Sequence, residues 1–201
     1  KHGRREMLEW CDKAYDHVQE LDKEFSDWLC VPRSVRTTSI KPSGTVSLLN
    51  GSTPGIHYPE AEYYIRRIRF SVGNVILKAI EEAGYHVEKD AYSPNTMVAS
   101  FPVHEPFFQK GKSEATMWEQ LEIAAAYQHY WADNSVSVTV TFNGDEAKDI
   151  KTALEMYESR LKAVSFLRFQ ETGYEQAPYE PITKEQYEEM SKNITPIDRI
   201  E

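Results

Sequence analysis

The chain has 201 residues, of which 40% are hydrophobic and 27% are charged, so its composition is that of a folded protein and not of a disordered one. No apolar run approaches the length of a transmembrane helix, and the basic N-terminal residues lead into a mixed sequence without the apolar core of a secretion signal. Two cysteines cannot build a disulfide framework. We therefore expect a cytoplasmic protein that does not act in a membrane.

Charge is distributed unevenly along the chain. The formal net charge is −9, which argues against a general nucleic-acid-binding role. Residues 33–78 nevertheless carry seven basic and two acidic side chains, whereas acidic residues dominate before and after them. One basic stretch in an acidic chain favours a small anionic ligand over a long polyanion.

The first part of the chain combines a long helix with a glycine-containing turn. Apolar residues recur at spacings of three and four over residues 7–29 and predict an amphipathic helix, which Pro32 ends. Residues 36–40 are rich in β-branched side chains, so they predict a short strand. This strand runs directly into the sequence Lys-Pro-Ser-Gly-Thr at residues 41–45.

Strands and helices alternate through most of the remaining chain. In chain order the predicted elements are a strand at 64–70, a helix at 74–83 ended by Gly84, a strand at 96–103, a helix at 116–131, a strand at 136–142, a helix at 147–162 and a strand at 164–169. Thr116 and Glu119 have the spacing of a capping box, and Thr183 and Gln186 predict a last short helix in an acidic tail. This alternation predicts an α/β architecture with parallel strands.

The clearest candidate binding site is the turn Ser43-Gly44-Thr45-Val46-Ser47. A turn between a strand and a helix leaves backbone N–H groups unpaired at the positive end of the helix dipole, where phosphate binds readily. Gly44 lets the backbone approach a ligand closely, and the three hydroxyls add donors. The turn is not a Walker loop, because its lysine precedes it. An alternative interpretation, in which Ser43 or Thr45 only caps a helix, remains open at this point.

Three arginines lie close together on the strand at 64–70. Arg66 is expected on one face of the strand and Arg67 and Arg69 on the other, so the three should not all reach one ligand. A solvated or salt-bridged strand edge explains at least two of them without a ligand.

Five further positions with reactive or polar side chains have structural explanations. His57 follows a turn, where a histidine is more often structural than catalytic, and turn chemistry accounts for Asp133 and Asn134 before a strand. Cys11 lies on the apolar stripe of the first helix and Cys30 at its end, and we expect both to be buried small hydrophobic residues. Nothing nearby in sequence offers a base that would activate either thiol.

Seven sequence blocks, taken together and in order, carry a resemblance to a known family. They are residues 36–49, 53–57, 63–69, 101–103, 131–137, 164–167 and 176–179. In this order the blocks resemble the adenosylcobalamin-dependent (class II) ribonucleotide reductases, most closely the monomeric enzymes that reduce ribonucleoside triphosphates. The resemblance extends from about Gly3 to Tyr187.

The resemblance implies part of a ten-stranded α/β barrel of the ribonucleotide reductase and glycyl radical type. In that family adenosylcobalamin generates a thiyl radical on a finger-loop cysteine, the radical abstracts the ribose 3′ hydrogen, and a cysteine pair supplies the reducing equivalents. The family turn that matches residues 43–47 binds substrate phosphates. Implied partners are a ribonucleoside triphosphate, thioredoxin or another dithiol reductant, and a deoxynucleotide effector.

Several family features have no counterpart in this sequence. The finger-loop cysteine and the reducing pair are missing, so we expect no catalytic residue in this chain, and the corrin-contacting residues are unknown. We expect residues 1–170 to form a C-terminal part of the catalytic barrel and residues 171–201 to form an acidic extension that ends before the C-terminal cysteines. The effector site should lie outside the chain.

Two rival interpretations are kept open. One is a reductase of another class; the di-iron reductases use a tyrosine pair on the last barrel strand, whereas residues 164–169 contain no tyrosine, which counts against that class. The other is a non-catalytic nucleotide-phosphate-binding module of the same fold.

Overall fold

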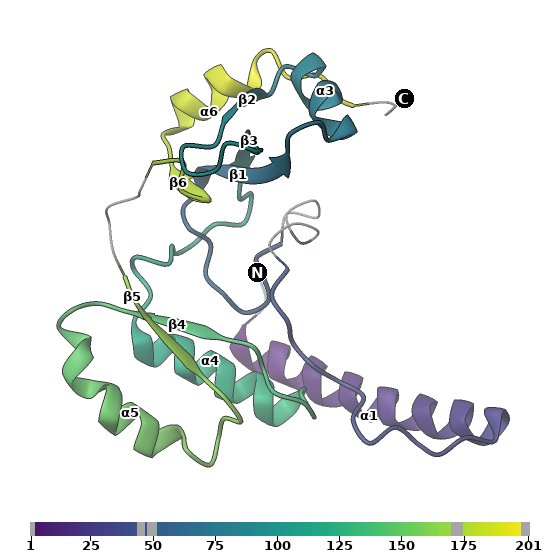
Figure 1. Ribbon diagram of the computed structural model, residues 1–201. Helices are drawn as coiled ribbons and strands as arrows, with labels where there is room; N and C mark the ends of the chain where they lie inside the picture. Colours follow the sequence, from purple (N-terminus) through teal and green to yellow (C-terminus); the bar gives the residue numbers. More distant parts are fainter. Residues whose placement is uncertain (1–2, 44–46, 48–51, 170–174, 198–201) are drawn as a thin grey trace. The chain divides into compact units, whose positions relative to one another are not determined.

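Helices and strands are mixed in the computed structural model, which describes residues 3–43, 47, 52–169 and 175–197 (Figure 1). The chain divides into two units, and each is described by itself. The first unit comprises Lys1–Tyr58 and Glu114–Phe169, and the second comprises Pro59–Ser113 and Gln170–Glu201.

The first unit begins with the long helix α1 (Arg4–Leu29), which confirms the helix expected at 7–29. Its end is set by Cys30, which adopts a left-handed conformation with φ 55° and donates its N–H to the carbonyls of Ser26 and Asp27. This is a standard helix-terminating geometry. The expectation that Cys30 is buried is wrong: it is exposed, because it stands at the helix end and not on the packed face.

The core of the first unit lies between α4 (Met117–Tyr130), β4 (Thr139–Phe142) and α5 (Ile150–Tyr157). The capping box at Thr116 and Glu119 is present and starts α4 as predicted. A short 3-10 helix, η1 (Glu146–Asp149), leads into α5, and β5 (Ser165–Arg168) pairs with β4 in parallel. The buried residues of this core are Met117, Leu121, Ala124, Ala125, Val138, Val140, Ala153 and Tyr157.

Residues 36–40 form no regular strand, contrary to the expectation. Only Ile40 makes a β-bridge, parallel to Val136. Two backbone groups before it are bonded to side chains: the Thr37 N–H donates to the Asp133 carboxylate, and the Ser39 carbonyl accepts from the Trp131 indole. Polar partners thus replace a strand ladder, which β-propensity alone cannot reveal.

The second unit is a four-stranded sheet with the order β2-β3-β1-β6. Its elements are β1 (Tyr63–Ser71), α3 (Val75–Glu82), β2 (His86–Lys89), β3 (Thr96–His104), β6 (Tyr179–Pro181) and α6 (Lys184–Ser191). The predicted strands at 64–70 and 96–103, the helix ended by Gly84 and the helix capped by Thr183 are all confirmed.

All strand pairs of this sheet are antiparallel, so the prediction of parallel strands holds for β4 and β5 and is wrong for the second unit. Two strands, β2 and β6, are not expected from the sequence. β6 has three residues and contains Pro181, which an edge strand tolerates because its N–H side needs no ladder partner. Within the described residues, no helix is both long and apolar enough to cross a membrane.

Candidate functional site

The predicted phosphate-binding turn is only partly described. Gly44, Thr45 and Val46 lie outside the described residues, whereas Ser43 and Ser47 are half-buried. The Ser47 N–H donates to the Ser43 hydroxyl oxygen (3.2 Å), and the Ser47 hydroxyl donates to the Ser43 carbonyl. The Ser43 hydroxyl is an acceptor in this contact, so its own hydrogen is not consumed by it.

The segment that leads into the turn is bonded to the corner between α4 and β4. The Asn134 N–H donates to the Thr38 carbonyl (3.1 Å), and the Ser137 N–H donates to the Ile40 carbonyl (3.0 Å). In the opposite direction, the Asp133 N–H donates to the Thr38 hydroxyl (3.0 Å). These reciprocal bonds fix residues 37–40 along the approach to the turn.

Asp133 is the most connected side chain of this corner. Its carboxylate accepts from the Tyr15 hydroxyl (2.7 Å), from the Thr37 N–H (3.0 Å) and hydroxyl (2.9 Å), and at 3.5 Å from the Gln19 amide. The Thr37 N–H, which binds the charged form, is the first cause that holds the pKa of Asp133 below its ordinary value of 3.8. Turn chemistry alone, the explanation expected from the sequence, does not account for these contacts from α1.

The segment that follows the turn is fixed by His57 and Gly55. The His57 ring lies 2.8 Å (Nδ1) from the Pro54 carbonyl, and its Nε2 accepts from the Thr139 N–H (3.0 Å). A neutral ring with its proton on Nδ1 satisfies both contacts, so His57 has the structural role that the sequence favours. Gly55 has φ 60°, and a Cβ there would stand 3.3 Å from the Lys41 carbonyl oxygen, so glycine permits the two stems of the turn to meet.

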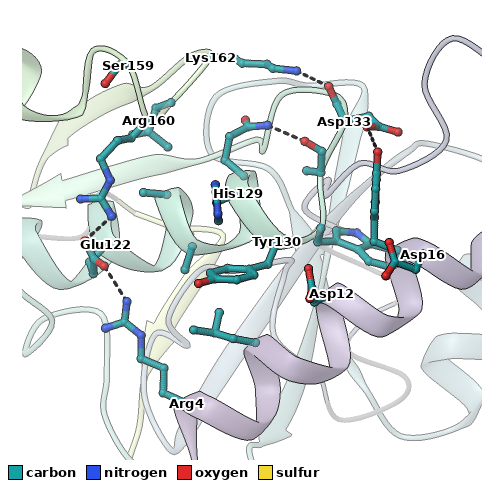
Figure 2. A pocket seen from close by; sticks show the side chains of 18 residues that line it. Arg4, Asp12, Asp16, Glu122, His129, Tyr130, Asp133, Ser159, Arg160 and Lys162 are labelled. Carbon is teal, nitrogen blue, oxygen red and sulfur yellow. Dashed lines mark hydrogen bonds and ion pairs between the residues drawn. The ribbon is translucent and has the colours of Figure 1, made fainter. Parts of the chain in front are cut away.

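A hollow of about 870 Å³ lies beside Asp133, between α1, α4 and residues 159–162 (Figure 2). Its basic side chains Arg4, Arg160 and Lys162 all donate to acceptors of the chain. Glu122 accepts from Arg4 (2.7 Å) and Arg160 (2.9 Å), and Lys162 donates to the Asp133 carbonyl. Burial raises the pKa of Glu122, but the hydrogen bonds from its two arginines and from Tyr157 outweigh it, so this pKa lies below 4.5. The two arginines and the lysine of this hollow are therefore already bonded within the chain.

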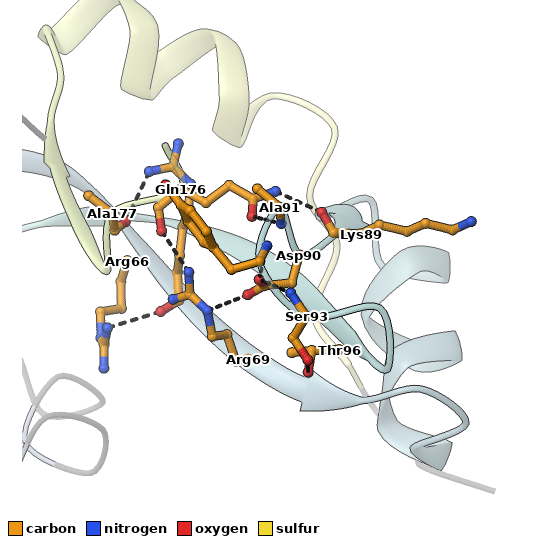
Figure 3. Close-up of polar contacts among 11 residues, drawn as sticks. Arg66, Arg69, Lys89, Asp90, Ala91, Ser93, Thr96, Gln176 and Ala177 are labelled. Atoms are coloured by element: carbon orange, nitrogen blue, oxygen red, sulfur yellow. Dashed lines mark hydrogen bonds and ion pairs between the residues drawn. The ribbon is translucent and has the colours of Figure 1, made fainter. Parts of the chain in front are cut away.

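The three arginines of β1 belong to the second unit and bind the chain itself (Figure 3). Arg66, Arg67 and Arg69 donate in turn to the carbonyls of Pro178, Ala177 and Gln176. Each arginine bonds a different carbonyl of the segment before β6, so the expectation that the three do not all reach one ligand stays a prediction. Ion pairs of Arg67 with Glu180 and of Arg69 with Asp90 confirm a salt-bridged edge.

The two cysteines do not form a redox pair. Cys11 is half-buried, and burial raises its pKa, which opposes formation of a reactive thiolate. Cys30 lies 19 residues further along the same helical segment, a rise of about 28 Å, far beyond disulfide distance. No group of three or more metal-ligating side chains is found among the described residues.

Two relatives found by comparison with known proteins are named as the same type of enzyme. The chain is 44% identical over 200 residues to a probable adenosylcobalamin-dependent ribonucleoside-triphosphate reductase of Dictyostelium discoideum, covering 98% of this chain and 26% of that protein. It is 44% identical over 195 residues to the adenosylcobalamin-dependent ribonucleoside-triphosphate reductase of Euglena gracilis, covering 96% of this chain and 27% of that protein. No family model matches the chain.

The fold is similar to that of a solved B12-dependent (class II) ribonucleotide reductase, with a TM-score of 0.86 and 34% sequence identity. The similarity covers 97% of this chain and 28% of the solved chain, so this chain spans about a quarter of the length of its relatives. The match confirms the expected fold class, a fragment of the reductase α/β barrel. The chain is thus homologous, over nearly its whole length and in both sequence and fold, to a segment of the adenosylcobalamin-dependent (class II) ribonucleotide reductases.

Proposed function

We propose that the full-length protein containing this chain reduces ribonucleoside triphosphates to 2′-deoxyribonucleotides with adenosylcobalamin as cofactor. In the overall reaction the 2′ hydroxyl leaves as water, and a dithiol supplies two electrons and two hydrogens and becomes a disulfide. The observation that carries the proposal is the similarity of 90% or more of this chain to proteins named as such reductases.

This chain contributes the binding of substrate phosphates through residues 43–47. Three features support the assignment: a glycine in a hydroxyl-rich turn, stems fixed on both sides to the residues before and within β4, and a Ser43 hydroxyl that accepts from the Ser47 N–H without using its own hydrogen in that contact. The backbone donors of such a turn bind anions without needing a lysine inside it.

The radical and redox chemistry belongs to other parts of the protein. Adenosylcobalamin, when bound, supplies the radical. We assign none of its contacts to residues of this chain. A reducing cysteine pair, thioredoxin or another dithiol reductant, and a deoxynucleotide effector act on the remaining segments, in a cytoplasmic setting.

The direct test is ribonucleotide reduction by the full-length protein, measured with and without adenosylcobalamin under a dithiol reductant. We expect turnover only with the cofactor. Turnover without it would assign the protein to another reductase class. Binding of triphosphate without turnover under either condition, from folded protein with all its cysteines, would identify a non-catalytic nucleotide-phosphate-binding module.

The turn is tested by Gly44→Val in the same full-length protein. A side chain at this position should block approach of the phosphates to the backbone, and the loss of one or two charge-assisted hydrogen bonds should raise the substrate KM about ten- to a hundredfold. Gly3→Val is the matched control, because a Cβ at Gly3 meets no atom within 4 Å. An unchanged KM for the Gly44 variant would remove the turn from the substrate site.

A further inference from the structure

Helix α1 is packed against the first unit along one side. The Tyr127 hydroxyl on α4 donates to the Met7 sulfur (3.2 Å), and the Tyr15 hydroxyl donates to the Asp133 carboxylate (2.7 Å). A second, mainly apolar row of side chains lies beside this packed side, and we call it the α1 stripe. It consists of Trp10, Ala14, His17, Leu21, Phe25 and Trp28.

The α1 stripe has the geometry of a helix-packing surface. Its positions are four, three, four, four and three residues apart, an average of about 3.6, so the row runs parallel to the helix axis. All its positions fall within about 80° of one another around the axis, and the row is about 27 Å long. A straight row of this length fits the side of a second helix, which packs through ridges and grooves. It does not fit a β-strand, because the side of a helix offers no backbone groups for a strand to bond.

The aromatic side chains of the α1 stripe are exposed in this chain. Trp28 is 69% exposed, Trp10 53% and Phe25 49%. The Phe25 and Trp28 rings pack edge to face with their centroids 5.4 Å apart, so the two present one apolar surface. α4 is too short to cover the whole of α1, since it has 14 residues against 26 (Figure 1). Three large aromatic side chains in one row mark an interaction surface, whereas single exposed apolar residues would not.

The α1 stripe is continuous with the packed side of α1. At 3.6 residues per turn, Met7, Cys11 and Val18 lie between the stripe and the contacts with the first unit, and all three are apolar and half-buried. A helix placed on the stripe would therefore extend the existing core instead of forming a separate contact. Such continuity is typical of packing within one polypeptide.

Acidic side chains border the α1 stripe on the side away from Met7. Glu20, Glu24 and Asp27 are exposed there. Lys13 is exposed in the same border, which remains acidic overall. Lys or Arg side chains beside the apolar face of a partner helix would complement this border, as the charges beside the seam of a coiled coil do. The expected partner is thus an amphipathic helix with a basic border.

The rest of the protein can supply such a helix. This chain covers 26% of the reductase of Dictyostelium discoideum and 27% of that of Euglena gracilis, so most of a protein of that length lies outside it. We propose that the α1 stripe is the packing surface for a helix from that remaining part of the same polypeptide, and not for a second copy or another protein. The inference goes beyond the proposed reaction and does not depend on it.

The test is photo-cross-linking in the full-length protein with p-benzoylphenylalanine in place of Trp28. The benzophenone reacts with groups in contact with it, so digestion and mass spectrometry identify the segment that covers the stripe. We expect a cross-link within one polypeptide to a peptide outside residues 1–201. The same amino acid in place of Lys23, an exposed residue on the opposite side of α1, is the matched control and should give no such cross-link.

Each other product would overturn the proposal. A cross-link between two copies would identify the stripe as a self-association surface, and a cross-link to residues 1–201 would show that this chain covers its own stripe. A folded protein that gives no cross-linked peptide at position 28 would show that the stripe faces solvent.

A second variant covers the case in which the photo-reactive protein does not fold. Phe25→Asp should lower the melting temperature of the full-length protein by roughly 5–10 °C, because a charged side chain would replace an aromatic one in a covered seam. Lys23→Asp should change it by less than about 2 °C. Equal melting temperatures for the two variants would overturn the proposal. Neither readout uses turnover, so failure of the proposed reaction and failure of this inference are distinguishable.

Discussion

Gly84 occupies a position that requires glycine for two reasons. It follows α3 with φ 88°, and a Cβ there would lie 2.4 Å from the Asn193 carbonyl oxygen, which is backbone and cannot rotate away. We therefore predict that Gly84→Ala lowers the free energy of unfolding by roughly 2–4 kcal/mol, measured by denaturant titration.

Gly73 provides the control for this prediction. It has a similar φ of 84°, but a Cβ there meets no atom within 4 Å. Gly73→Ala should therefore cost only the backbone strain, about 1 kcal/mol. Equal costs at the two glycines would mean that the contact with Asn193 contributes nothing.

Single residues were predictable from the sequence where their partners are close in the chain. The caps at Thr116 and Thr183 depend on a residue three positions later, and both are present. The contacts of Asp133 were not predictable, since its partners Tyr15 and Thr37 are about a hundred residues away in sequence. No local pattern marks a carboxylate whose donors arrive from another helix.

Among the elements, β6 depends on side chains more than on its own ladder. The segment before it is held by Gln176, whose amide donates to the Lys89 carbonyl (2.8 Å) and accepts from the Ala91 N–H (2.8 Å). Gln176 has φ 55°, an unfavourable conformation that these bonds and the arginine contacts stabilise.

We predict that Gln176→Ala loosens β6 while the rest of the sheet persists. The amide hydrogens of Arg67 and Ile182, which bond to Pro178 and Tyr63 across this edge, should exchange about ten- to thirtyfold faster once the side-chain bonds are lost. Glu175→Ala, at the neighbouring exposed position, should leave these rates unchanged. Equal exchange in both variants would show that the ladder alone holds β6.

The turn between β2 and β3 should give the second unit a defined acid sensitivity. The Tyr92 N–H, with Arg69 and the Ser93 N–H, holds the pKa of Asp90 below its ordinary value of 3.8 and outweighs the opposing effect of burial. A carboxyl with a lowered pKa in the folded state stabilises it fully above the unfolded pKa and loses that contribution as the pH falls through the folded pKa.

We therefore predict that Asp90→Asn changes how the stability of the protein depends on pH. The difference in free energy of unfolding between the native protein and the variant should be constant near neutral pH and should shrink as the pH drops below about 3.8. Denaturant titrations at a series of pH values measure it. A difference that does not depend on pH would mean that the contacts of Asp90 do not require its charge.

Elements were predictable in proportion to their length and regularity. The helices and the nine-residue strands follow from apolar periodicity, whereas β2 (His-Val-Glu-Lys) and β6 (Tyr-Glu-Pro) carry too few apolar side chains to show a pattern. The prediction of strand direction was wrong for a different reason. Alternation of helices and strands predicts parallel pairing, but β1 and β3, which are separated in the chain by α3 and β2, pair antiparallel. Pairing of distant segments is a tertiary property.

At the scale of the whole molecule, the positions of the cysteines predict that the redox chemistry takes place in other segments of the protein. Neither Cys11 nor Cys30 can reach the other, and the reducing thiols are proposed to lie in other segments. Replacing both by serine in the full-length protein should therefore keep turnover within about twofold of the native rate. A folded double variant without activity would place a redox cysteine in this chain.

The stretch from Asp133 to Thr139 fastens both stems of the turn, through Asn134 and Ser137 on one side and Thr139 on the other. Because successive residues of an extended chain point in opposite directions, inserting or deleting one residue here would reverse which groups face each stem. Homologous sequences that retain the turn should therefore vary in residue identity along this stretch but not in its length. Gaps in an alignment should lie outside this stretch, so its constant length would identify the turn in homologous sequences.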